Sequence, residues 1–538
     1  MSESKRLDAV IVGAGLAGVY MLHRLRKLGL TARVFEAGSG IGGTWFWNRY
    51  PGARCDIESM EYSYQFSDAL QREWEWTERY ATQPEILRYI NHVADRFELR
   101  DDIQLNTRVQ AAHYDESDGL WHVATSAGAV TARFCIMATG CLSCANTPDF
   151  EGLGSFGGDW YHTGAWPHAG VDFTGKRVGV IGTGSSAIQS IPLVARQADH
   201  LYVFQRTPNY SVPAHNGPID PEQVASIKAN YRAFREENWT HGFGANFRDS
   251  AALAAEATPE QRQAEYEARW AAGGLAFLGA YADLVFDPQA NQTAAKFIRD
   301  KIRAIVQDPQ VAEALCPTTM VGCKRMCVDT DYYETFNRSN VTLVDVSKAP
   351  VERITPMGLT VDGKPYELDI IVFATGFDAM TGALMRIDIR GRSGQRLTDK
   401  WGAGPRTYLG LSVAGFPNLF TITGPGSPSV LSNMLPSIEQ HVNWIADCIE
   451  HLDAHQISAI EATVAAEDAW VEHVNAVAGA SIYPTCNSWY LGANVPGKPR
   501  VFMPYLGVPT YVEKCVQVAA DDYDGFEKIA CGGSAVAS

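Results

Sequence analysis

Short hydrophobic runs alternate with amphipathic segments from the start of the chain. Residues 8–12 form a compact hydrophobic run, residues 16–28 place a hydrophobic side chain at every third or fourth position, and residues 31–36 form a second run. Compact runs are typical of buried strands, and a spacing of three to four is typical of a helix. This order predicts the strand, helix and strand that begin a doubly wound parallel sheet.

The same pattern returns further along the chain. Residues 177–181 and 201–204 predict strands, and between them a tight turn at 182–187 leads into a helix through Leu193 and Ala195. Further strands are expected at 121–125, 130–137, 341–346, 368–373 and 418–423, and a further helix from about residue 437. The predicted fold class is therefore α/β, with two Rossmann-like dinucleotide-binding domains.

Residues 211–323 interrupt the second unit with a helical pattern. Two triplets are helix-start signals, Asp220-Pro221-Glu222 and Thr258-Pro259-Glu260. The hydrophobic residues after the first triplet keep a helical spacing: Val224, Ile227, Tyr231 and Phe234. Isoleucines at the same spacing mark a third helix: Ile298, Ile302 and Ile305. We expect a helical insertion inside the second domain.

Composition and charge narrow the class of protein. The chain has 538 residues, 46% of them hydrophobic and 20% charged, as in globular proteins with a sizeable core. A net charge of −16 argues against nucleic acid or an anionic membrane as a partner. The 11 cysteines are scattered, which favours free thiols in a reducing cytoplasm. No segment is apolar enough for membrane insertion, and a monomer is compatible with the sequence.

Three glycines between strand and helix mark the first unit as a nucleotide site. They are Gly13, Gly15 and Gly18, and Glu36 ends the next strand. Glycines let the backbone approach a pyrophosphate at the helix N-terminus, and the carboxylate accepts hydrogen bonds from ribose hydroxyls. A structural glycine-rich turn is the alternative; together with the second unit, the pattern predicts a dinucleotide that stays bound, FAD.

The second unit differs where the next strand ends. Its turn contains Gly182, Thr183, Gly184, Ser185 and Ser186, followed by Ala187 in the place of a third glycine. The strand ends in Arg206 and Thr207, with no carboxylate there. A guanidinium can pair with a 2′-phosphate, which predicts NADPH as the exchanging dinucleotide, although Arg206 could also be an ordinary surface arginine.

FAD and NADPH together are used by flavin disulfide reductases and by flavin monooxygenases. A reductase needs a cysteine pair beside the flavin, and Cys141-Leu142-Ser143-Cys144 has the required spacing, while Cys323 and Cys327 are four residues apart. Cys141 follows a turn rather than opening a helix, so we favour ordinary thiols for this pair. A disulfide reductase and a catalytically idle dinucleotide-binding protein remain the alternatives.

Two longer motifs carry a resemblance to a known family. The first consists of Phe156, Gly158, His162, Trp166 and Pro167, just before the second glycine turn. The second runs from Gly43 and Trp45 through Tyr50-Pro51-Gly52 to Asp56. Both resemble signatures of the Baeyer-Villiger monooxygenases. Residues 48–56, 374–379, 424–429 and 492–498 are most similar to the phenylacetone, steroid and acetone monooxygenase branch, whereas Gly507-Val508-Pro509 departs from an expected Gly-Gly pair.

The resemblance implies insertion of one oxygen atom of O₂ next to a ketone carbonyl, giving an ester or lactone, with sulfide oxidation as a secondary activity. A peroxide adduct of the flavin would be the oxidant and Arg325 the cation that stabilises it, with Asp56 as its carboxylate partner. Surface pairing for Arg325 and turn capping for Asp56 are the alternatives. For His162 we favour a structural hydrogen bond over acid or base catalysis.

The resemblance also implies the remaining site residues. Lys324 would join Arg206 at the 2′-phosphate, and Trp489 would belong to a loop over the cofactor or serve simple packing. Further cofactor contacts are implied for Thr44, Trp45 and Tyr50. The implied substrate pocket comprises Cys141, Leu142, Ser429, Val430 and Leu431, and no metal is expected. The predicted domains are residues 1–142 and 378–538 for FAD, and residues 143–210 and 324–377 for NADPH, with 211–323 as the insertion.

Overall fold

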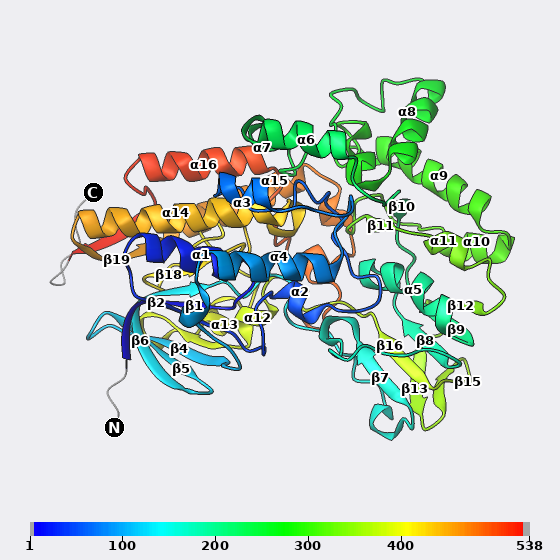
Figure 1. Cartoon of the computed structure of the whole chain (residues 1–538), viewed down its shortest axis with the longest axis horizontal. Helices are drawn as coiled ribbons and strands as arrows, with labels where there is room; N and C mark the ends of the chain where they lie inside the picture. The colour runs from blue at the N-terminus through cyan, green and yellow to red at the C-terminus, as the bar shows by residue number, and fades with distance from the viewer. Residues whose placement is uncertain (1–4, 531–538) are drawn as a thin grey trace.

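A computed structural model describes residues 5–530 and contains two sheets of the predicted kind (Figure 1). The first sheet has the strand order β17-β4-β5-β6-β1-β2-β3, and β18 also pairs with β6. Its strands are β1 (Lys5–Val12), β2 (Ala32–Phe35), β3 (Ile103–Gln104), β4 (Val109–Asp115), β5 (Leu120–Thr125), β6 (Gly128–Met137), β17 (Asp388–Arg390) and β18 (Leu419–Thr421). β1 runs parallel to both β2 and β6, while β4, β5 and β6 form an antiparallel meander.

The second sheet is parallel throughout and has the order β12-β9-β8-β16-β7. Its strands are β7 (Asp159–His162), β8 (Arg177–Ile181), β9 (His200–Gln205), β12 (Val341–Asp345) and β16 (Ile370–Phe373). A small antiparallel sheet lies beside it, formed by β13 (Val351–Thr355), β14 (Gly358–Val361) and β15 (Lys364–Glu367). The α/β fold class with two Rossmann-like units is confirmed.

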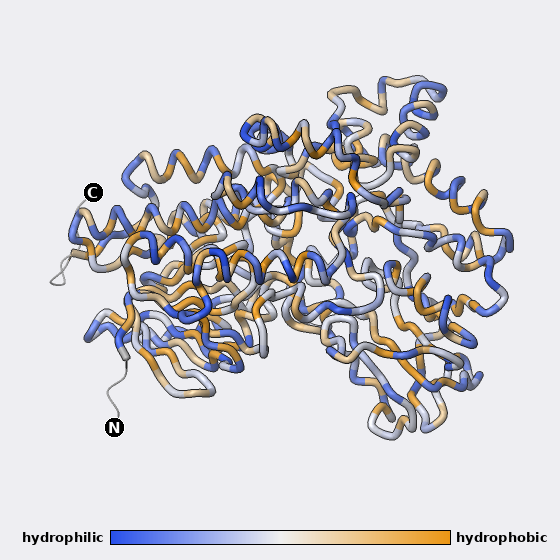
Figure 2. Tube along the Cα trace, in the orientation of Figure 1, coloured by the Kyte–Doolittle hydropathy of each residue, from blue (hydrophilic) through white to orange (hydrophobic). Residues whose placement is uncertain are grey.

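In each sheet the nucleotide-type helix directly follows the strand that enters the glycine turn. α1 (Leu16–Lys27) follows β1, and α5 (Ser185–Gln197) follows β8. The long α14 (Met434–Ala454) packs against α1, with α16 (Val508–Ala520) on its other side. Hydrophobic and hydrophilic residues alternate along α14 and α16 with the helical period, so one face of each helix is buried (Figure 2).

Shorter elements complete the first half and the C-terminal part. The helices are α2 (Thr44–Trp47), α3 (Asp68–Glu73), α4 (Gln83–Arg96), α11 (Tyr332–Thr335), α12 (Gly382–Met385), α13 (Leu397–Lys400) and α15 (Val464–Gly479). β19 (Ile457–Ala462) pairs with β20 (Phe526–Ala530) at the edge of the first domain. α14 begins three residues before the predicted position, because Asn433 accepts a hydrogen bond from the Leu435 amide and caps the helix.

The insertion is helical and stands on a two-stranded stem. β10 (Ser211–Pro213) pairs in parallel with β11 (Cys327–Asp329), so the insertion leaves and re-enters the fold at one place. Its helices are α6 (Pro221–Ala229), α7 (Tyr231–Asn238), α8 (Pro259–Ala272), α9 (Pro288–Ile305) and α10 (Pro309–Leu315). The single helix expected from residue 221 onward is wrong, because Asn230 leaves the helical conformation, with φ −142°, and separates α6 from α7.

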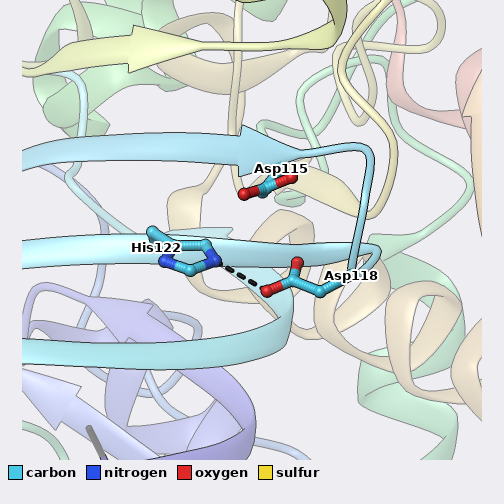
Figure 3. A group of neighbouring side chains, drawn as sticks. All are labelled: Asp115, Asp118 and His122. Atoms are coloured by element: carbon cyan, nitrogen blue, oxygen red, sulfur yellow. Dashed lines mark hydrogen bonds and ion pairs between the residues drawn. The ribbon is translucent and has the colours of Figure 1, made fainter.

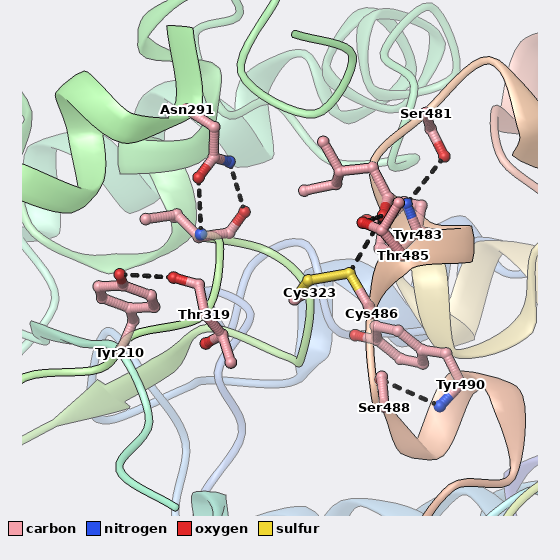
Figure 4. The surroundings of a disulfide bond; sticks show 12 residues. Tyr210, Asn291, Thr319, Cys323, Ser481, Tyr483, Thr485, Cys486, Ser488 and Tyr490 are labelled. Carbon is pink, nitrogen blue, oxygen red and sulfur yellow. Dashed lines mark hydrogen bonds between the residues drawn. A yellow bond between two sulfur atoms is a disulfide. The ribbon is translucent and has the colours of Figure 1, made fainter. Parts of the chain in front are cut away.

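The expectation that all thiols are free is also wrong. Cys323 and Cys486 form a disulfide between the insertion stem and the C-terminal part of the chain (Figure 4). The prediction failed because cysteine counting does not reveal which sulfur atoms a fold brings together over 163 residues. Within residues 5–530, no helix is both long and apolar enough to cross a membrane.

Candidate active site

The first glycine turn forms a cradle that has no room for side chains. Gly13 has φ +104°, and a Cβ there would lie 2.6 Å from the Ala138 carbonyl oxygen. A Cβ at Gly18 would collide with the Gly13 carbonyl, and one at Gly43 would lie 2.9 Å from Gly15 Cα. Gly15 caps α1 without a side-chain hydrogen bond, so the first amides of α1 stay available to an anion. The turn fits the pyrophosphate of FAD.

Glu36 lies at the end of β2, beside this cradle. Its carboxylate is buried and accepts hydrogen bonds from the Ala14 amide at 2.8 Å and the Gly38 amide at 2.7 Å. These two bonds fix the orientation of the carboxylate and leave further lone pairs for ribose hydroxyls. The predicted role of Glu36 therefore agrees with its geometry.

The second cradle lies at the N-terminus of α5. Gly182 has φ +116°, and a Cβ there would collide with the Ala374 carbonyl, whereas a Cβ at Gly184 would meet nothing within 4 Å. The cap of α5 again lacks a side-chain hydrogen bond. An uncapped helix end beside open space fits a second dinucleotide. The hydroxyls of the turn are held by neighbours: Thr183 donates to the Thr207 carbonyl at 2.8 Å, Ser186 Oγ lies 3.1 Å from Thr163 Oγ1, and Ser185 Oγ lies 3.4 Å from Cys327 Sγ.

Two cations stand close together at the edge of the second cradle. Burial and, after it, the charge of Arg206 lower the pKa of Lys324. Arg206 is exposed, and neither side chain has an ion-pair partner within residues 5–530. Two adjacent cations without a counter-charge repel each other, and a dianionic phosphate would relieve that repulsion. The pair fits the 2′-phosphate of NADPH.

Arg325 and Asp56 meet between the two cradles. Arg325 Nε donates to Asp56 Oδ2 and Nη2 donates to Oδ1, both at 2.8 Å, and Nη1 donates to the Val430 carbonyl at 3.2 Å. The two side chains are 18% and 25% exposed. Burial acts to lower the pKa of Arg325, but the Asp56 carboxylate outweighs it, so the pKa lies above its ordinary value. Arg325 is a permanent cation whose direction is fixed.

Phe243 is a neighbour of Arg325 that the sequence did not reveal. The guanidinium carbon lies 4.8 Å from the centre of the Phe243 ring, within the range of a cation–π contact. Phe243 comes from the insertion, between α7 and α8, and belongs to no motif. A lone aromatic residue in a loop carries no sequence signal for this contact.

The residues of the implied substrate pocket lie together near Arg325. Cys141 Sγ lies 2.9 Å from Ser429 Oγ, and Val430 accepts the bond from Arg325. Ser429, Val430 and Leu431 form a short 3₁₀ turn, and Leu142 is half-buried beside the core. Ser429 has φ +45°, which is strained for a residue with a side chain.

His441 on α14 holds the segment that leads to this turn. Its Nδ1 accepts a hydrogen bond from the Thr423 amide at 2.8 Å, and its Nε2 lies 2.8 Å from the Tyr511 hydroxyl. Tyr511 in turn donates to the Leu409 carbonyl at 2.6 Å, so His441 Nε2 carries the proton. Burial lowers the pKa of His441 to about 3, and the ring is neutral.

The signature residues 156–167 lie in and around β7, the edge strand of the second sheet. His162 Nδ1 accepts from the Gly164 amide at 2.9 Å, and Nε2 lies 3.3 Å from Thr375 Oγ1. Burial lowers the pKa of His162 to about 4. The remaining residues have packing positions: Phe156 is half-buried, Gly158 abuts the Asp369 carbonyl, Trp166 is 4% exposed and Pro167 follows it. These contacts agree with a structural role for His162.

The other predicted cofactor contacts surround the same region. Thr44 is exposed at the N-terminus of α2, next to the first cradle, and Trp45 is buried and donates to the Tyr62 hydroxyl at 3.1 Å. The Tyr50 hydroxyl lies 2.9 Å from Gln189 Oε1 on α5, so it bridges the two domains. Trp489 is half-buried in a 3₁₀ turn, Trp489–Leu491, against Tyr490.

The cysteine pair 141 and 144 lacks the features of a redox disulfide. Both are buried and free, and burial raises the pKa of each thiol. A reductase needs a lowered thiol pKa, because the thiolate is the reactive form. Cys323, the other candidate, is bonded to Cys486 and not to Cys327. The disulfide reductase alternative is therefore not supported.

One exposed group resembles a metal site but has other partners. Asp115, Asp118 and His122 lie at the hairpin of β4 and β5 (Figure 3). Asp115 accepts hydrogen bonds from Ser117, and Asp118 accepts from the Leu120 amide and pairs with His122 at 2.9 Å. These contacts account for all three side chains within their own hairpin.

Two glycine cradles on two Rossmann-like units, with a fixed arginine between them, define a two-dinucleotide flavoprotein oxidoreductase. Residues 10–237 match the family model described as pyridine nucleotide-disulphide oxidoreductase. Relatives match over the full length. The chain is 44% identical to a Baeyer-Villiger monooxygenase of Pseudooceanicola batsensis, over 96% of this chain and 95% of that protein.

Two further relatives lie in the predicted branch. The chain is 42% identical to the acetone monooxygenase (methyl acetate-forming) of a Gordonia species, over 97% of this chain and 98% of the relative. It is 53% identical to a steroid monooxygenase whose structure was determined in the oxidised state with NADP, with a TM-score of 0.94 over 98% of this chain and 100% of the other. The chain belongs to the Baeyer-Villiger monooxygenase family and is an FAD- and NADPH-dependent monooxygenase, as the sequence predicted.

Proposed function

We propose that this chain oxidises ketones to esters or lactones at the site formed by Arg325, Asp56 and the turn at 429–431. The observation that supports the proposal best is the double hydrogen bond between Arg325 and Asp56. It aims a permanent cation at the space between the two nucleotide cradles. A ketone and O₂ would meet there.

Bound FAD, once reduced by NADPH, supplies the activated oxygen. The protein must then stabilise negative charge that develops on oxygen during the attack on the ketone carbonyl. Arg325 suits this task because its pKa is high and its position is held by Asp56 and the Val430 carbonyl. Phe243 on one side of the guanidinium keeps water from that face.

The second cradle would hold NADPH through four kinds of contact. The amides at the start of α5 would bind the pyrophosphate, Arg206 and Lys324 the 2′-phosphate, Thr207 the adjacent ribose, and Trp489 would cover the nicotinamide side. In this arrangement the FAD domain comprises residues 1–142 and 378–538, and the NADPH domain comprises residues 143–210 and 324–377. The insertion, residues 211–323, supplies Phe243.

The proposal extends to the state and location of the enzyme. We propose a monomer in the cytoplasm, because NADPH is supplied there and eight described cysteines are free. Size-exclusion chromatography with light scattering tests the monomer.

The oxygen donor is tested with ¹⁸O₂: the holoenzyme with NADPH and a small ketone should form an ester with one ¹⁸O atom. Unlabelled ester, or none from a panel of linear, cyclic and aryl ketones, would contradict the proposal, and the same panel extended to sulfides tests the secondary activity.

A further inference from the structure

The disulfide joins the segment just before Lys324 and Arg325 to the C-terminal segment around Tyr483 and Tyr490 (Figure 4). Cys323 directly precedes Lys324 and Arg325, and Cys486 lies three residues before Trp489. Their Cα atoms are 5.4 Å apart, within the range that a disulfide spans without backbone movement. The bond therefore fixes the distance between the arginine segment and the Trp489 loop.

Other contacts between these segments are few and local. Cys323, Ile482 and Cys486 form a small hydrophobic cluster that is separate from the main core, with Met320 and Leu491 at its border. The Ile482 amide donates to the Val285 carbonyl at 2.9 Å. Tyr483 and Tyr490 of the loop are buried in the main core, and the Met503 amide donates to the Tyr490 carbonyl at 3.1 Å. The small cluster contributes little burial between the two segments, so the disulfide is the covalent link between the loop and the arginine segment.

The pairing is specific among the cysteines of the structure. Eight other cysteines within residues 5–530 are buried and free, and Cys531 lies outside these residues. Disulfides in a reducing compartment are usually transient or redox-sensing. One bonded pair beside the cofactor site, in a chain whose other described cysteines are free, has the features of a redox-sensing disulfide.

We propose that Cys323 and Cys486 form a reversible thiol–disulfide modification site, whose bonded form holds the Trp489 loop against Lys324 and Arg325. This inference rests on the proposed roles of those three residues in binding NADPH and in oxygen transfer. The oxidant is hydrogen peroxide, which reduced flavoproteins release when O₂ reacts without a substrate. The bond would thus respond to uncoupled turnover.

The chemistry balances with peroxide as the two-electron acceptor. The sulfur of one thiol attacks a peroxide oxygen, the O–O bond breaks, one water leaves, and a sulfenic acid forms. The second thiol then attacks that sulfur, the S–O bond breaks, and a second water leaves as the S–S bond forms. The two thiol protons end in the two water molecules. A dithiol reductant reverses the change through a mixed disulfide.

Burial makes the site dependent on loop opening. Cys323 is 4% and Cys486 6% exposed, so a reagent reaches either sulfur after the loop has moved away. Reduction should let the loop leave the cofactor more often and so weaken NADPH binding. We expect the KM for NADPH to rise at least about fivefold, the lower end of a typical coupling between two sites.

The test uses the holoenzyme in two states. One sample is treated with dithiothreitol and one with hydrogen peroxide, and both are denatured, alkylated with a mass tag and digested. The peroxide sample should contain two fewer free thiols and a cross-linked peptide that joins Cys323 to Cys486. Parallel samples, freed of the reagents, should differ in the KM for NADPH by the expected factor in a ketone assay.

Variants separate the bond from general effects of the reagents. Cys486→Ser should show the high KM in both states, and Cys316→Ser, which removes a buried free thiol of the same insertion, should behave like the wild type. If Cys486→Ser does not fold, the two states of the wild type still decide the matter. A missing cross-link, or a cross-link without a change in KM, overturns the inference. A failure of the proposed oxygenation appears instead as absent ester in both states.

Discussion

Asp56 and Arg325, 269 residues apart in the chain, face each other through two parallel hydrogen bonds of 2.8 Å. These two hydrogen bonds hold the long Arg325 side chain in one conformation. A pre-aimed donor stabilises developing charge without reorganising during the reaction.

Arg325→Ala should separate the two halves of the catalytic cycle. Flavin reduction by NADPH needs stacking and orientation, so it should persist, whereas ester formation should fall by about two to three decades, or about 3 to 4 kcal/mol. Asp56→Ala should act in the same direction but less severely. Anaerobic stopped-flow reduction followed by mixing with O₂ and ketone measures both steps. A near-normal ester yield from Arg325→Ala would mean that the cation is another residue.

Arg206→Ala should reduce the preference for NADPH over NADH by about ten- to a hundredfold, because it removes a charge-assisted contact of about 1.5 to 3 kcal/mol. The ratio of kcat/KM for the two cofactors measures this preference. Arg196→Ala is a suitable control, since Arg196 is an exposed arginine of the same domain that pairs with Asp331. Unchanged selectivity in Arg206→Ala would remove the 2′-phosphate from this place.

Replacing Cys141 and Cys144 together by serine should leave ketone oxygenation within about an order of magnitude. Neither thiol has a lowered pKa, and Ser at 141 keeps a hydrogen-bonding group beside Ser429. Ester formation per bound FAD is the appropriate measure. Complete loss of turnover in a variant that still binds FAD would show that a thiol takes part in the reaction.

His441 should make the fold sensitive to acid. Its pKa is about 3 in the folded state against 6.5 as the ordinary value, so the unfolded chain binds the extra proton first. The stabilisation is present above about pH 6.5 and is lost as the pH falls toward 3. His441→Asn keeps an acceptor for the Thr423 amide but does not titrate. Melting temperatures from pH 8 to 5 should fall less steeply in this variant; equal slopes would exclude the assigned cause.

The sequence alone determined the parts of this protein that depend on neighbours along the chain. The glycine turns at 13–18 and 182–187 require close backbone approach within one strand–helix unit, so their spacing carries the information. The acidic Glu36 and the basic Arg206 directly follow the next strand of each unit, and they led to the prediction of FAD and NADPH. The Baeyer-Villiger motifs at 43–56 and 156–167 then indicated the family.

The tertiary structure decided which distant residues meet. No local pattern places Phe243 over Arg325 or bonds Cys323 to Cys486, because these contacts depend on how the insertion folds back over the first domain. The sequence also did not predict the break between α6 and α7 at Asn230, because the hydrophobic spacing of three to four residues continues across it. Periodicity reports which face of an element is buried, whereas the partner of a side chain is set by packing between segments far apart in the chain.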